Sequence, residues 1–253
     1  MAEIEKTIAD YTQLKQLVNN ELFTMSESLI KTLENSLVIA IYSLSEQLLK
    51  NTIYKILEVQ FDIDQQTPKD RYILGQMPPE RYPVTPTIER ILAEMKFYYP
   101  KFELYTPSIV MNYKDSYVKL VKARHDYAHA NNHTQNIDFD SAKKFVEYLN
   151  FQYNDINNGN YISKIKSLYN LLNKFVDKEH FRNFYPHYEA KSNEINELVN
   201  ELDTLYNSDE SYDIDYLNDI YEPLREGYTI LLNITEESFS EDIEKFKNCI
   251  ADI

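Results

Sequence analysis

Glycine, proline and cysteine are scarce in this chain of 253 residues, which holds 3 glycines, 9 prolines and 1 cysteine. Because tight turns depend on glycine and proline, a chain with so few of them is expected to contain few tight turns. The repeated alternation of apolar and polar residues that indicates strands is not seen between turn dipeptides. The single thiol, Cys249, excludes a disulfide framework within the chain and is typical of a reducing compartment. These absences favour a protein built from long helices.

Long apolar runs are also absent. No stretch approaches the roughly 20 apolar residues that a membrane-spanning helix needs. Residues 1–15 carry acidic side chains and lack the apolar core of a signal peptide. We therefore expect a cytoplasmic protein that does not enter a membrane.

The net charge of -15 is spread unevenly. Residues 1–130 hold 15 Lys and Arg against 17 Asp and Glu, whereas residues 131–253 hold 11 against 24. A strongly acidic surface repels nucleic acid, so any nucleic-acid site is expected in the nearly neutral first part. The simplest interpretation of the acidic part is a solvated face.

Apolar residues recur at helical spacing along the whole chain and predict an all-α fold. Leu37, Ile41, Leu44 and Leu48 form the expected core stripe of an unusually apolar helix. The expected helices cover residues 3–20 with a continuation toward 33, then 37–59, 85–98, 106–130, 138–153, 162–175, 195–205, 216–231 and 238–250. Thr85 and Thr106, each followed by proline, are expected to cap two of them, and Asp138 or Asp140 a third.

Chemistry-bearing side chains concentrate at residues 124–133. Arg124 and His129 are separated by four residues, and His125 and His133 lie close by. Arginine keeps its charge and offers a fork of donors that fits a phosphate, while histidine moves protons near neutral pH. The segment ends a predicted amphipathic helix with Tyr117, Val118, Leu120 and Val121 as its apolar stripe and Lys114, Lys119 and Lys122 toward solvent.

The Arg-x4-His spacing resembles the RxxxxH signature of the HEPN superfamily, small all-helical domains of which many are metal-independent ribonucleases. The order of helices is also similar, because a long apolar helix with one central acid, Glu46, precedes the motif and an amphipathic helix follows it. The resemblance covers roughly residues 1–156. Many members have Asn directly after the Arg, where this chain has His125.

The resemblance implies a HEPN-like antiparallel helical bundle over residues 1–156, with an appended acidic helical region over 157–253. It also implies a metal-independent endoribonuclease without a cofactor, acting as a toxin or in antiviral defence. Arg124 would hold the scissile phosphate, and His129 would serve as base and acid while the 2′-hydroxyl of RNA attacks. DNA is not an expected substrate.

The family's sites are usually composite, and one Arg-x4-His motif per chain therefore implies a homodimer. A protein partner that inhibits or activates the enzyme is also expected. The acid on the preceding helix usually faces the motif arginine, which predicts that Glu46 pairs with Arg124. The remaining expected site residues support catalysis or contact RNA: His125, Asp126, Tyr127, Asn131, Asn132, His133, Lys119 and Lys122.

Two other interpretations of the motif stay open. His125, His129 and His133 lie at i, i+4 and i+8 and could bind a metal ion from one helix face, provided that the helix continues past two asparagines. Alternatively, Arg124 pairs with Asp126 or Glu46, His129 is a partly buried polar residue, and the protein is a non-catalytic helical adaptor, sensor or antitoxin partner.

Overall fold

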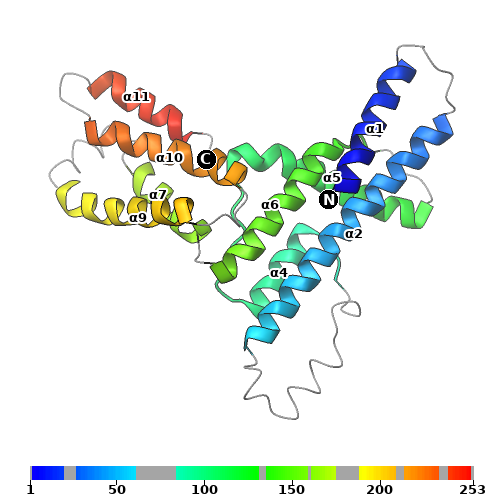
Figure 1. The fold of residues 1–253 in the computed structure, drawn as a ribbon, viewed down its shortest axis with the longest axis horizontal. Coiled ribbons are helices and arrows are strands. Elements are labelled where there is room, and N and C mark those ends of the chain that lie inside the picture. The colour runs from blue at the N-terminus through cyan, green and yellow to red at the C-terminus, as the bar shows by residue number, and fades with distance from the viewer. Residues whose placement is uncertain are drawn as a thin grey trace, which may run out of the picture. The chain divides into compact units, whose positions relative to one another are not determined.

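The computed structural model describes residues 2–19, 27–60, 84–130, 135–158, 161–174, 188–208, 214–233 and 239–251. The regular structure of these residues consists of nine α-helices, which confirms the predicted all-α class (Figure 1). Within this described part, no helix combines the length and the apolar character that crossing a membrane requires.

The chain divides into two compact units. Unit 1 comprises Met1–Leu104 and Asn112–Tyr153, and unit 2 comprises Tyr105–Met111 and Asn154–Ile253. The helices of unit 1 are α1 (Ala2–Asn19), α2 (Glu27–Gln60), α4 (Ile88–Tyr98) and most of α5 (Ser108–Ala130) and α6 (Phe139–Asn158). The division expected from the sequence, after residue 156, lies within the last turn of α6.

Helix α2 is one continuous helix of 34 residues, whereas the sequence predicted an interruption between residues 33 and 37. The predicted continuation of α1 toward residue 33 lies partly outside the described residues, and α2 already begins at Glu27. Helix α1 folds back along α2 and packs against it (Figure 1).

The buried stripe of α2 differs from the predicted one. Leu37 and Ile41 are buried as expected, but Leu44 and Leu48 are only half-buried. The stripe passes instead through two hydroxyl-bearing residues, Ser45 and Thr52, which apolar spacing alone does not reveal. The complete set of buried side chains among the described residues of α2 is Leu37, Val38, Ile41, Ser45, Leu49, Thr52, Ile53 and Ile56.

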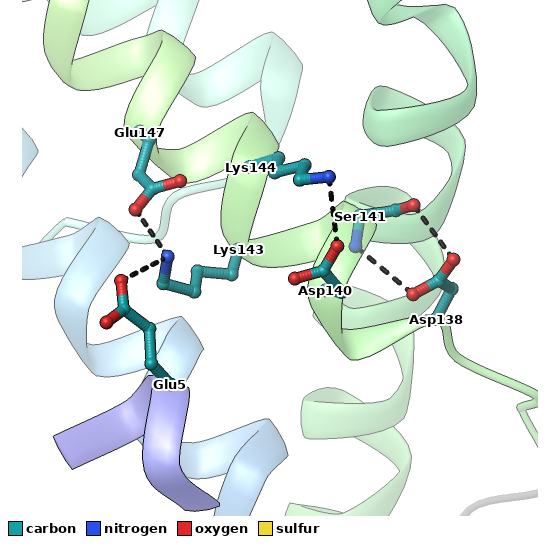
Figure 2. A network of polar contacts seen from close by, with 7 residues as sticks. All are labelled: Glu5, Asp138, Asp140, Ser141, Lys143, Lys144 and Glu147. Atoms are coloured by element: carbon teal, nitrogen blue, oxygen red, sulfur yellow. Dashed lines mark hydrogen bonds and ion pairs between the residues drawn. The ribbon is translucent and has the colours of Figure 1, made fainter. Parts of the chain in front are cut away.

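A buried ammonium group fastens α1 to α6 (Figure 2). The Nζ of Lys143 on α6 lies 3.0 Å from Oε1 of Glu5 on α1 and 2.5 Å from Oε1 of Glu147 one turn further along α6. Burial lowers the pKa of Lys143, but the hydrogen bonds and charges of Glu147 and Glu5 outweigh it, so the net shift is upward. Lys143 is therefore charged at neutral pH and both of its acidic partners are compensated.

The start of α6 is capped by Asp138, one of the two expected caps. Its carboxylate accepts hydrogen bonds from the backbone N–H of Ser141, at 3.1 Å, and from the Ser141 hydroxyl, at 2.8 Å (Figure 2). Asp140 pairs instead with Lys144 on the exposed side of the same helix, at 3.1 Å. The capping bond satisfies a backbone donor that the first turn of a helix would otherwise leave open.

Unit 2 contains α7 (Tyr161–Asn173), α9 (Tyr188–Ser208), α10 (Ile214–Asn233) and α11 (Phe239–Ile250). Helix α10 packs against each of the other three. Gly227 permits the close approach of α11, because a Cβ at that position would lie 3.2 Å from Ile250 and 3.3 Å from Phe246. The half-buried Cys249 lies on α11, and burial together with the charge of Glu226 raises the pKa of its thiol.

The N-terminus of α7 is capped from the last turn of α6. The buried carboxylate of Asp155 accepts hydrogen bonds from the backbone N–H of Tyr161, at 2.6 Å, and of Ile162, at 3.0 Å. Burial raises the pKa of Asp155, and the two amides and Lys164 oppose that shift without cancelling it. One side chain thus satisfies two open donors at the corner between successive helices.

Replacing Lys143 by Met should lower the free energy of unfolding by about 1–3 kcal/mol, because Glu147 and Glu5 lose their shared cation. Lys144→Met is the matched control, since the side chain of Lys144 is 44% exposed and its pair with Asp140 contributes at most about 0.5 kcal/mol. Urea unfolding of both variants measures the difference.

The pKa of Lys143 is higher in the folded than in the unfolded chain, so its contribution is complete at neutral pH and is lost only as pH rises through the folded value. The cost of Lys143→Met should therefore be the same at pH 6 and pH 8. Equal stability losses for the two lysine variants would contradict a structural role for the buried ammonium group.

Candidate functional site

The predicted motif lies within the last two turns of α5, and the helix continues through it to Ala130. The expected C-terminal caps Asn131 and Asn132, and with them His133, lie outside the described residues. On the buried face of α5, Tyr117, Leu120 and Ala123 have no exposed surface. Val118, predicted to belong to the buried stripe, is 47% exposed.

The hydroxyl of Tyr117 connects α5 to α2 and to the segment before α4. It donates a hydrogen bond to the carbonyl oxygen of Pro86, at 2.5 Å, and lies 2.7 Å from the Oγ of Ser45. A phenol has one proton, so Ser45 must be the donor in the second bond. Both bonds are buried, and together they fix the position of α5 relative to residues 84–87.

Helix α4 begins at Ile88, with Thr87 as its N-cap. The Thr87 side chain accepts a hydrogen bond from the backbone N–H of Arg90, at 3.2 Å. The prediction that Thr85 is the cap was wrong by two residues. The carbonyl oxygen of Thr85 accepts a hydrogen bond from the N–H of Thr87, at 2.9 Å, and its hydroxyl is hydrogen-bonded with the Tyr42 side chain. Thr85 therefore fastens the segment to α2 instead of starting the helix.

A pocket of about 490 Å³ lies where α2, the start of α4 and the second half of α5 meet. Its polar wall is formed by Arg124, Lys122, His125, Glu89, Thr85 and Thr87. Its apolar wall is formed by Val118, Val121, Ile88 and Ala128 with the rings of Tyr42 and Tyr117. A volume of this size is typical of a small-molecule site, and the exposure of Val118 follows from its position in this wall.

Arg124 is held by an aromatic ring. Its guanidinium carbon lies 5.6 Å from the centre of the Tyr42 ring, a cation–π contact. Glu46, the predicted partner of Arg124, pairs with Lys50 on its own helix at 2.6 Å. The prediction failed because Lys50 is four residues from Glu46 and reaches it along the surface of α2, while Tyr42 occupies the position facing Arg124.

Three polar groups nevertheless act on the Tyr42 hydroxyl. Burial raises the pKa of Tyr42 most and the Glu46 carboxylate adds to this, while Arg124 and the Thr85 hydrogen bond oppose the shift. The pKa remains above its ordinary value, so Tyr42 is a neutral phenol at physiological pH. Arg124 therefore meets the face of a neutral ring.

The two described histidines of the motif lie side by side. The rings of His125 and His129 have centroids 4.4 Å apart, and both side chains are exposed. His125 lines the pocket with Lys122 and Arg124, and His129 adjoins it through His125. The predicted site residues Lys119, Asp126 and Tyr127 do not belong to the pocket wall in the described part of the chain.

No three His, Cys, Asp or Glu side chains of the described residues are grouped closely enough to hold a metal ion. His133, the third member of the histidine series, lies outside those residues. The cationic side of the pocket is instead suited to an anion. The α4 N-terminus adds the positive end of a helix dipole, and the carboxylate of Glu89 is the one acid among the wall residues that the structure describes.

Sequence reasoning missed Tyr42, Thr85 and Val118 as members of the site. Tyr42 could have been found, because it precedes Glu46 by one turn and shares its face of α2. The sequence pattern assigns Thr85 to a helix cap and Val118 to the core, and neither assignment points to a pocket.

Comparisons with protein-family models, with curated proteins and with solved structures find no match for this chain.

Tyr117→Phe should destabilise the protein by about 1–3 kcal/mol, because the buried Ser45 hydroxyl and Pro86 carbonyl lose their partner. Tyr153→Phe is the control: Tyr153 is also buried, but its hydroxyl has no hydrogen-bond partner among the described residues, so its removal should cost little or increase stability. Denaturant unfolding compares the two. Similar losses in both variants would show that the Tyr117 hydrogen bonds do not hold the pocket together.

Proposed function

We propose that this chain is a metal-independent endoribonuclease of the HEPN type, in which Arg124 holds the scissile phosphate and His129 moves protons. The observation that supports this most directly is the position of Arg124. It lines a pocket beside Lys122 and His125, and it has no carboxylate partner among the described residues. A guanidinium with open donors in a cavity favours binding of a phosphate.

The chemistry requires few residues, because RNA carries its own nucleophile. In the proposed reaction the 2′-hydroxyl loses its proton to His129 and attacks the adjacent phosphorus. The bond to the 5′-oxygen breaks, that oxygen receives the proton that His129 took up, and the first product ends in a 2′,3′-cyclic phosphate. Arg124 stabilises the charge that develops on the phosphoryl oxygens, and His125 assists beside His129.

The mixed character of the pocket wall supports a nucleotide as the ligand in preference to a bare anion. Val118, Val121 and Ile88 offer apolar surface next to the cationic side chains. A base of single-stranded RNA can lie on that wall while its phosphate meets Arg124, since unstacked bases need an apolar or aromatic surface. The acidity of residues 131–253 predicts that binding of bulk RNA is weak and strongly weakened by salt.

The assembly and setting of the proposed enzyme come from the family resemblance. A homodimer would bring two Arg124–His129 segments to one cleft, and a protein partner would restrain or trigger a toxin or an antiviral effector. Light scattering that gives the mass of a single chain under conditions where the protein cleaves RNA would remove the dimer from this proposal.

Arg124→Ala and His129→Ala should each reduce RNA cleavage by at least about a hundredfold, the contribution expected of a proton-transfer or charge-stabilising group. Both residues lie near the end of α5, so melting temperature and circular dichroism should change little. Lys245→Ala, which removes an exposed cation from α11, is the control and should cleave normally.

Normal cleavage by both motif variants would show that the site assignment is wrong. If purified wild-type protein cleaves no RNA in a mixed pool, the alternative, a non-catalytic helical interaction module, replaces the enzyme.

The mechanism predicts a specific pattern of substrates and conditions. EDTA should not affect the rate, because the positive charge comes from Arg124 and not from a metal ion. DNA, and RNA with a 2′-deoxy residue at the cleavage position, should stay intact. A 3′-hydroxyl product, or rescue of EDTA-treated protein by zinc or manganese, would rule out this mechanism.

A further inference from the structure

Arginine side chains near a protein surface are commonly fixed by a carboxylate, but no carboxylate of the described residues forms an ion pair with Arg124. Its guanidinium lies over the Tyr42 ring, with 5.6 Å between the guanidinium carbon and the ring centre. Glu46, the acid that follows Tyr42 by one turn on α2, forms an ion pair with Lys50 at 2.6 Å. Asp126 is two residues from Arg124, a spacing that directs the two side chains to different sides of α5.

The kind of contact decides what Arg124 can still bind. A bidentate pair with a carboxylate occupies two of the N–H donors that a phosphate would need. A ring face attracts the positive charge and takes none of the five donors. Arg124 can therefore be held in place and remain fully available to an anion in the pocket.

The ring is itself fixed. Its hydroxyl is hydrogen-bonded with the side chain of Thr85, and the backbone around Thr85 is held by the Thr87 N–H and by the bond from Tyr117 to the Pro86 carbonyl. Tyr42 is half-buried in the pocket wall, where burial and Glu46 keep it protonated. A neutral phenol forms no ion pair with Arg124 that would divert the guanidinium from a ligand.

We propose that Tyr42 is the positioning residue of this site: its ring holds the Arg124 guanidinium in the pocket with the donors free for a substrate phosphate. This inference rests on the proposed function for the identity of the substrate, but the cation–π contact can be tested by binding alone. Tyr42 acts through Arg124 and takes no part in the chemical step.

The test measures binding of a fluorescein-labelled RNA 12-mer that carries 2′-O-methyl groups, so that it cannot be cleaved. Tyr42→Leu, which removes the ring, should weaken binding by about 3- to 30-fold, the range for cation–π contacts of intermediate exposure. Tyr42→Phe keeps the ring face and should bind within about twofold of wild type. Tyr54→Leu, which removes another half-buried tyrosine of α2, is the matched control and should bind as wild type does.

A double-mutant cycle separates positioning from general stabilisation. In an Arg124→Ala background, Tyr42→Leu should cause no further loss of binding, because the group that the ring holds is gone. Further loss in that background, or unchanged binding by Tyr42→Leu alone, would overturn the proposal. So would failure of the wild-type protein to bind the probe.

The outcomes also separate this inference from the proposed function. If wild-type protein binds the probe, and the Tyr42 and Arg124 losses are non-additive as expected, Tyr42 positions Arg124 even if native RNA is never cleaved. In that case the endoribonuclease proposal is wrong and the positioning role of Tyr42 stands. If RNA is cleaved and depends on Arg124 but Tyr42→Leu binds and cleaves normally, the enzyme stands and the positioning role is wrong.

Discussion

The two hydrogen bonds at the Tyr117 hydroxyl determine the geometry of the candidate site. They join three segments that are distant in the sequence: α5, the middle of α2 at Ser45, and the carbonyl of Pro86 before α4. In an interior of low dielectric constant such bonds are strong, and an open donor or acceptor there is costly. Tyr42 lies one turn from Ser45 and Arg124 two turns from Tyr117, so fixing the hydroxyl also brings the guanidinium over the ring.

Two cations of unit 1 have contrasting surroundings. Lys143 lies between Glu5 and Glu147, and its charge serves to hold α1 on α6 (Figure 2). Arg124 meets a ring and faces a pocket, and no carboxylate of the described residues compensates it. A compensated cation stabilises the fold, whereas an uncompensated one next to a cavity favours an anionic ligand. This contrast supports a binding role for Arg124 more strongly than the spacing of the motif does.

Apolar periodicity was sufficient to predict the helical class and the approximate positions of the described helices, because burial of a stripe depends mainly on residues of the same helix. Partners on other helices were not predictable in that way. Ser45 can be buried because its hydroxyl donates a hydrogen bond to Tyr117. Thr85 is not a helix cap, and its hydroxyl is hydrogen-bonded with Tyr42 on another helix. The family resemblance predicted that Glu46 pairs with Arg124, although another cation, Lys50, lies one turn away from Glu46 on the same helix.

The close packing of α11 on α10 gives unit 2 a built-in reporter of its own motion. Cys249, the single thiol of the chain, lies half-buried on α11, where burial and the charge of Glu226 raise its pKa. Thiol reagents attack through the thiolate, so the group reacts slowly while the two helices stay together. Because α11 packs against α10 at Gly227, separation of α11 from α10 would bring the half-buried thiol fully into solvent and return its pKa toward the ordinary value. A change in the rate of thiol labelling therefore reports a change in the packing of this helix, without an engineered probe.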